Sequence, residues 1–257
     1  MALQLDHEDI ASLHEAIGDL QVLQGDYSPA RESYEVAAAH CDRSQEARIE
    51  RKLGALCHRR GEWELAESHF QAALDSLAQG EASIEQARLY SDWSLTAYHR
   101  GDPGRARNMT NKALDIAESI GDKRALSEAH NILGILARGQ RNFDDAVDQL
   151  ELSLQAAEEQ SDPSARVAAL NNLALALGDK GESERAIAFA KAALTLCTSQ
   201  GDRHREAAIH NNLSDLLHAA SESEAAMEHL KQAVTIFAEI GIEASEMQPE
   251  IWKLVEW

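Results

Sequence analysis

The stretch that decides the fold is LGALCHRRGEWELAESHFQAAL, residues 53–74. It opens with a large apolar residue followed by a small one, Leu53 and Gly54. Later in the stretch Ala66 and Phe70 stand four residues apart, the interval that brings side chains to one face of an α-helix. A glycine between the two halves marks a tight turn, so the stretch predicts two amphipathic helices that pack as a hairpin.

The same pattern recurs at a fixed period. Alanine occupies every fortieth position through most of the chain, at Ala66, Ala106, Ala146, Ala186 and Ala226. A small residue stands twelve positions before each alanine, and a large apolar residue stands one position before that. One further copy lies upstream, thirty-six residues before its neighbour. The sequence therefore predicts a repeat protein of six units.

This order of residue types resembles the tetratricopeptide repeat, and the best copy consists of Leu53, Gly54, Ala66, Phe70 and Ala73. The period exceeds the usual one of about thirty-four. That length is typical of the long-repeat subtype in kinesin light chains, Leu-Gly-Asn-type regulators and sensor regions of bacterial signalling ATPases. The resemblance implies an all-α fold, a right-handed α-solenoid. We expect six helix hairpins at roughly residues 11–46, 47–86, 87–126, 127–166, 167–206 and 207–246.

A separate capping helix is expected at residues 247–257. Ile251, Leu254 and Val255 form one apolar stripe there, and such a helix can cover the stacking face of the last repeat. The two tryptophans of this segment belong either to that cap or to an exposed docking surface. The first repeat has no equivalent cap, which is compatible with a piece of a larger multidomain chain.

The composition argues against several classes of protein. The 257 residues carry a formal net charge of −20, which disfavours general binding to DNA or RNA because neutralising phosphates requires a positive surface. No apolar run approaches the ~18 residues of a membrane span, and the N-terminus lacks a secretory signal pattern. We therefore expect a cytoplasmic protein that contacts neither nucleic acid nor membrane.

The sequence shows no pattern typical of catalysis or of a bound cofactor. A glycine-rich phosphate loop, GxSxG, HExxH and paired-cysteine metal spacing do not occur. The cysteines, Cys41, Cys57 and Cys197, are odd in number and widely spaced, which favours buried free thiols. We expect no enzyme activity, no cofactor and no metal.

Basic and aromatic residues recur at positions that face the groove in the resembled family, where the first helix of each hairpin lines the concave side. These residues are Arg48, Arg51, His58, Arg59, Arg88, Tyr98, His99 and Arg138. In one interpretation, planar guanidinium groups hold an anionic ligand. In the other, the arginines balance neighbouring acids such as Glu50 and Asp92, and each pair contributes about 0 to 1 kcal/mol.

A second set of candidates is a ladder of asparagines. Asn131, Asn171 and Asn211 occupy the fifth position of the last three repeats, and Asn172 and Asn212 occupy the sixth. An asparagine side chain offers donors and acceptors together, so a row of them can pair with the main chain of an extended peptide. The alternative is that these asparagines bond neighbouring helices and hold the superhelical twist.

The leading hypothesis is a non-enzymatic protein-protein interaction module that binds an extended, acidic peptide in its concave groove. One alternative is a ligand-sensing regulatory domain of a larger signalling ATPase or transcription regulator, with a small molecule or a neighbouring domain in the groove. Another is a scaffold that assembles by end-to-end stacking of uncapped repeats.

Overall fold

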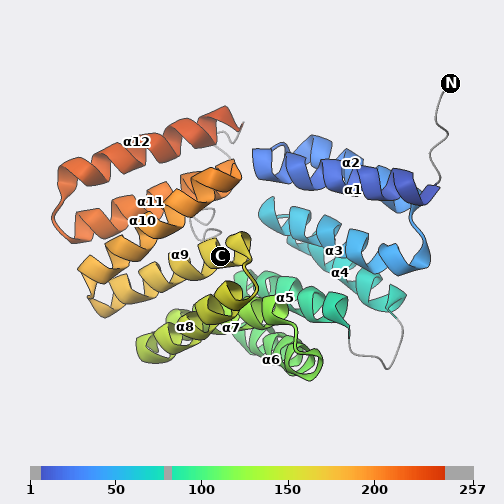
Figure 1. Ribbon diagram of the computed structural model, residues 1–257, viewed down its shortest axis with the longest axis horizontal. Helices are drawn as coiled ribbons and strands as arrows, with labels where there is room; N and C mark the ends of the chain where they lie inside the picture. The colour runs from blue at the N-terminus through green and yellow to red at the C-terminus, as the bar shows by residue number, and fades with distance from the viewer. Residues whose placement is uncertain (1–6, 78–82, 241–257) are drawn as a thin grey trace. The chain divides into compact units, whose positions relative to one another are not determined.

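The computed structural model describes residues 7–77 and 83–240. Within these residues all regular elements are α-helices, labelled α1 to α12 in Figure 1. Their bounds are α1 His7–Gln24, α2 Tyr27–His40, α3 Arg43–Arg59, α4 Trp63–Ser76, α5 Ile84–His99, α6 Pro103–Ile120, α7 Lys123–Gly139, α8 Phe143–Glu159, α9 Pro163–Lys180, α10 Ser183–Gln200, α11 Arg203–Ala219 and α12 Ser223–Glu239. None of these helices is long and apolar enough to cross a membrane. The capping helix predicted at 247–257 lies outside the described residues.

The chain divides into two compact units, residues 1–116 and 117–257, and the division falls within α6. In the first unit α1 packs on α2 and α3 packs on α4, and successive hairpins touch through α2 with α3 and α4 with α5. In the second unit the hairpins α7 with α8, α9 with α10 and α11 with α12 follow in the same way (Figure 1). The fold is the all-α helical-repeat solenoid that the sequence predicts.

A small residue in the first helix of a hairpin lets the second helix approach closely. A Cβ atom built on Gly54 would lie 2.6 Å from Cε1 of Phe70, and one built on Gly134 would lie 2.5 Å from Cγ of Leu150. Phe70 and Leu150 are both 0% exposed. In these two hairpins the small residue of the first helix therefore faces a large buried residue of the second helix, without space for another methyl group.

The turns inside the hairpins contain a residue in the left-handed region. Gly61 and Gly181 supply it at φ 72° and 88°. Arg141 and Ser221 take the same place in the fourth and sixth hairpins, at φ 61° and 65°. Other residues adopt these angles less readily than glycine. The chain therefore keeps its turn geometry even where the sequence departs from the glycine pattern.

Candidate functional site

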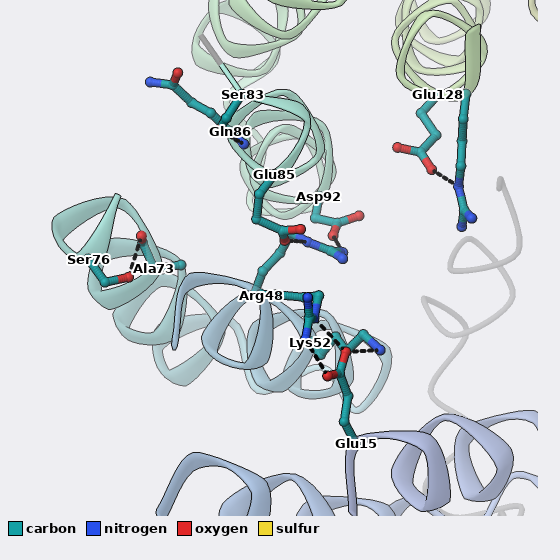
Figure 2. A network of polar contacts seen from close by, with 12 residues as sticks. Glu15, Arg48, Lys52, Ala73, Ser76, Ser83, Glu85, Gln86, Asp92 and Glu128 are labelled. Atoms are coloured by element: carbon teal, nitrogen blue, oxygen red, sulfur yellow. Dashed lines mark hydrogen bonds and ion pairs between the residues drawn. The ribbon is translucent and has the colours of Figure 1, made fainter. Parts of the chain in front are cut away.

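The first predicted groove residue, Arg48 on α3, forms a two-pronged ion pair with Glu15 on α1. Its Nε lies 2.8 Å from Oε1 and its Nη2 lies 2.9 Å from Oε2. Lys52 approaches the same carboxylate at 2.8 Å, and Figure 2 shows Glu15 facing both cations. Burial by itself would raise the pKa of Glu15, but the hydrogen bonds from Arg48 and Lys52 outweigh it and the pKa is lowered.

Arg51 lies between two carboxylates of α5. It bonds Glu85 through Nε and Asp92 through Nη1, the latter at 2.7 Å. The two acids are seven positions apart and so share one face of α5, as Figure 2 shows. The Arg51 side chain is only 13% exposed. Burial opposes its charge, yet the two carboxylates raise the pKa of Arg51 above its usual value.

Three further predicted residues meet in an aromatic cluster of the first unit. His58 is 4% exposed, and its Nδ1 lies 2.8 Å from Oγ1 of Thr96. The His58 ring centroid is 5.2 Å from that of Trp63 and 5.2 Å from that of His99. Trp63 stacks on His99 at 5.7 Å with 12° between the planes, and Tyr98 meets His99 edge to face at 5.6 Å. Burial is the main reason that the pKa of His58 lies well below its usual value.

Arg59 and Arg88, the remaining basic candidates of the first unit, are partly buried. After burial and the charge of His99, the charge of Arg59 is the third cause that lowers the pKa of His58. Arg88 on α5 has a buried Nε for which no residue in the described part of the chain provides an acceptor. A buried donor without a partner is unfavourable, so this guanidinium has unused capacity for a ligand.

Four of the predicted asparagines, Asn131, Asn171, Asn172 and Asn212, form a hydrogen-bonded row across α7, α9 and α11 of the second unit, and Asn211 stands beside Asn212 on α11. Nδ2 of Asn172 donates to Oδ1 of Asn131 at 3.0 Å, and Nδ2 of Asn212 donates to Oδ1 of Asn171 at 3.0 Å. Within α9, Nδ2 of Asn171 lies 3.5 Å from Oδ1 of Asn172. All five are at most 8% exposed. The row joins neighbouring repeats, as the alternative interpretation describes, and contact with a peptide stays a prediction.

Asn211 and Arg138 lie on the outer helices of this row. Among residues 7–77 and 83–240, none bonds the side chain of Asn211. Arg138 on α7 pairs with Asp179 on α9, with 2.6 Å between Nε and Oδ2. The Arg138 side chain is 20% exposed, so its charge is largely taken up by this partner. Of the two residues, Asn211 has the greater free hydrogen-bonding capacity.

One offset relates the contacts between repeats. Four pairs that contain a predicted site residue stand 41 residues apart, one period plus one residue: Arg51 with Asp92, Arg138 with Asp179, Asn131 with Asn172, and Asn171 with Asn212. Sequence reasoning found one member or both members of each pair, but it did not identify the partners Glu15 and Glu85 or the aromatic ring of Trp63. The sequence signal for the acids was their distance of about one repeat from a basic residue, 33 and 34 positions.

The first unit holds Arg48, Arg51, His58, Arg59, Arg88, Tyr98 and His99, and the second holds Arg138 and the asparagines. Each set is close together within its own unit. A model of the tetratricopeptide repeat matches residues 45–119, 85–159 and 165–239, well over half of the chain. No curated protein matches the sequence.

Solved structures of similar fold share little sequence with this chain. The Rap protein complexed with Competence and Sporulation Factor matches with a TM-score of 0.74 at 17% identity, over 93% of this chain and 67% of that one. A STAND signal-transduction ATPase with a tetratricopeptide repeat sensor, from Pyrococcus horikoshii, matches with a TM-score of 0.64 at 16% identity, over 90% of this chain and 35% of that one. BtubC from P. vanneervenii matches with a TM-score of 0.60 at 18% identity, over 90% of this chain and 92% of that one. At these identities the likeness shows the fold alone.

Proposed function

The chain belongs to the tetratricopeptide repeat family, and on that premise we propose that it is a non-enzymatic, cytoplasmic interaction module that binds an extended peptide. This fold is generally an interaction module, because its repeats present one long surface to a partner. The observation that carries the proposal is the asparagine row of the second unit. Its side chains lie in register on three successive first helices.

The contacts inside the row prepare it for a peptide. An asparagine side chain has two donor hydrogens and two acceptor lone pairs, and each contact within the row uses only one of them. Asn131 and Asn171 are held in place by Asn172 and Asn212, so little side-chain entropy remains to be lost on binding. With neighbouring helices about 10 Å apart and an extended chain rising about 3.3 Å per residue, each repeat would meet about three peptide residues.

For the first unit, taken by itself, we propose a surface for acidic segments. Arg48 and Arg51 already have carboxylate partners there, so a ligand carboxylate must compete for them. Arg88 has a buried Nε without a partner among the described residues, which makes it the first candidate to hold an acidic side chain. Arg59 and the cluster of His58, Tyr98 and His99 add positive charge and aromatic faces to the same unit.

A selection experiment tests this proposal. A displayed library of random extended peptides is selected on the wild-type chain and then depleted on Asn211→Ala. The matched control is Gln155→Ala on α8, because Gln155 is exposed and, among the described residues, its side chain bonds Glu159 alone. We expect peptides that bind wild type and the control more tightly than they bind Asn211→Ala. Peptides that bind all three chains equally would contradict the proposed site.

A second candidate function is a regulatory sensor. The observation that favours it is the fold shared with the tetratricopeptide repeat sensor of the Pyrococcus horikoshii ATPase, of which this chain spans 35%. In that case the ligand of the same surface is a small molecule or a neighbouring domain. A metabolite extract that raises the melting temperature of wild type but not of Asn211→Ala, with no peptide selected, would favour the sensor.

End-to-end assembly has its own support on α1. Leu13 and Leu20 are 49% and 61% exposed, whereas Ile49 and Leu56, thirty-six residues later, are 0% and 2% exposed. Ile49 and Leu56 pack against the apolar side chains of α2, so α1 presents an uncovered stacking face. Light scattering across a concentration range, compared with Leu13→Glu/Leu20→Glu, tests this function. A wild-type monomer at high concentration would contradict it.

A further inference from the structure

One contact recurs at the same place in three hairpins. The fourth residue of the repeat meets a residue nineteen positions later on the second helix, and histidine takes part each time. The pairs are Glu50 with His69 at 2.8 Å, His130 with Gln149 at 2.9 Å, and His210 with His229 at 2.8 Å. Among these three pairs, two imidazole rings face each other only in the last.

The last pair joins α11 to α12. The two Nδ1 atoms are 2.8 Å apart, and the ring centroids are 5.0 Å apart with 40° between the planes. Both rings are partly exposed, so an ion in solution has access to them. Burial is the largest cause that lowers the pKa of His210 and of His229. A neutral imidazole keeps one nitrogen lone pair free for a metal.

The charged groups around the pair are of both signs. Glu206 and Arg203 on α11 lie near the first ring, and Lys191 on α10 and Glu228 on α12 lie near the second. Glu206 is itself held by Arg203 at 2.8 Å. No group of three or more His, Cys, Asp or Glu residues suited to a metal occurs in the described residues. An ion bound by the two rings therefore completes its coordination with water.

We infer that His210 and His229 form a two-imidazole site for a late first-row divalent metal ion, with Cu²⁺ preferred. With metal–nitrogen bonds of about 2.0 Å, ligands at right angles on a tetragonal ion stand about 2.8 Å apart, and ligands of a tetrahedral ion stand about 3.3 Å apart. The observed separation of 2.8 Å matches the tetragonal case. In the metal-free chain one Nδ1 donates a hydrogen bond to the other. To bind the ion, the donor ring changes to its Nε2–H tautomer, and rotation of both rings about their Cβ–Cγ bonds turns the two Nδ1 lone pairs toward the metal.

Metal binding at this site should stabilise the last hairpin, which consists of α11 and α12. Because α11 and α12 each supply one ligand, the bound ion cross-links the two helices and stabilises the folded hairpin over the unfolded chain. Protons compete for the same lone pairs, so the affinity falls as the pH drops. Cu²⁺ binds more tightly than Ni²⁺ or Zn²⁺, both from the ligand spacing and from the general order of divalent affinities.

The chain offers matched variants for a test. His229→Gln reproduces the natural His130–Gln149 pair of the fourth hairpin, so it removes one ligand while it keeps a contact that the fold already uses. Gln149→His makes the reverse change and builds a second histidine pair. Isothermal titration with Cu²⁺ at pH 7.5 and electron paramagnetic resonance, which counts coordinated nitrogens, are applied to wild type and both variants. Helical circular dichroism checks that all three are folded.

For wild type, we expect the titration to show one Cu²⁺ ion that binds more tightly than any further Cu²⁺ ions. Its electron paramagnetic resonance spectrum should show two coordinated imidazole nitrogens. His229→Gln should weaken that site at least tenfold, and Gln149→His should add a second site of similar affinity. An isotherm unchanged by His229→Gln would overturn the proposal, because the tight site would then use other residues. A folded Gln149→His chain that gains no site would overturn the geometric argument.

Discussion

Oδ1 of Asn131 accepts a hydrogen bond of 3.0 Å from Nδ2 of Asn172, a residue 41 positions later. The fifth position of one repeat thereby meets the sixth position of the next. Arg51 and Asp92 occupy the same two positions in the first unit and form an ion pair there. One contact between repeats is therefore ionic in the first unit and built from amides in the second.

This relationship makes Asn172 a structural residue. Asn172→Ala leaves Oδ1 of Asn131 buried without its donor, which should cost about 1 to 3 kcal/mol in the free energy of unfolding. Asn211→Ala should cost much less, because the Asn211 side chain bonds none of the described residues. Urea unfolding followed by circular dichroism measures both. Equal losses for the two variants would contradict the hydrogen-bonded row.

Arg51 should matter for stability as well as for the shape of the surface. Arg51→Met leaves Glu85 and Asp92 close together without their cation, which should lower the free energy of unfolding by about 1 to 3 kcal/mol. Lys123→Met is the control, since Lys123 and its partner Glu159 are 46% and 43% exposed. We expect the urea midpoint to fall for Arg51→Met and to stay unchanged for the control. The reverse order would refute the assignment.

Acid should destabilise the first unit through His58. Its pKa in the folded state lies below the value of about 6.5 in the unfolded chain. The unfolded state therefore binds more protons, so stability is full above pH 6.5 and falls as the pH drops from 6.5 toward the folded pKa. The pKa values of His210 and His229 are lowered as well, so these residues also contribute to the loss of stability in acid. The effect of His58 is therefore measured as the difference between wild type and a variant that lacks it.

Melting temperatures of wild type and His58→Gln between pH 7.5 and 5 provide that difference. We expect a shallower pH dependence for the variant. The lowered pKa of Glu15 acts in another window: its contribution is present above about pH 4.5 and is lost below it. Parallel curves for wild type and His58→Gln would contradict a difference in the pKa of His58 between the folded and unfolded states.

The hairpin contact can be tested at Gly54. Gly54→Ala places a methyl group 2.6 Å from Cε1 of Phe70, an approach that requires movement and should cost about 1 to 3 kcal/mol. Gly104→Ala on α6 is the control, because its nearest neighbour is the Asp102 carboxylate at 3.6 Å. In the control, the helical preference of alanine should leave stability equal or higher. Equal effects of the two changes on the thermal midpoint would contradict the close packing.

The helices and their packing could be predicted because they follow from local spacing. Leu53, Gly54 and Phe70 belong to one hairpin, and their contact depends only on helical period and turn length. The partners of Arg51 and Asn131 lie in the next repeat, and the offset of 41 residues is set by how successive hairpins stack. A single sequence gives the period of the repeat but not that stacking register.

The pair of His210 and His229 also depends on packing that a single sequence does not give, here within one hairpin. The sequence predicts no metal, because it contains no metal-binding motif and no paired-cysteine spacing. His229 stands on the second helix, nineteen residues after His210, and only the packing of α11 on α12 brings the rings together. The aromatic ring of Trp63 was missed for a related reason, since its stack on His99 joins two different hairpins. The predicted cap at 247–257 is outside the described residues.

The most direct test of the central claim is the affinity of a selected peptide and its singly N-methylated forms for wild type and Asn211→Ala. Methylation removes one main-chain donor at a time without changing a side chain. If the asparagine row binds the peptide main chain, one methylated position should weaken binding to wild type about tenfold, as the loss of a bond near 1.4 kcal/mol implies. The same methylation should have no further effect on Asn211→Ala. Equal losses for both chains, or no loss at any position, would contradict the account.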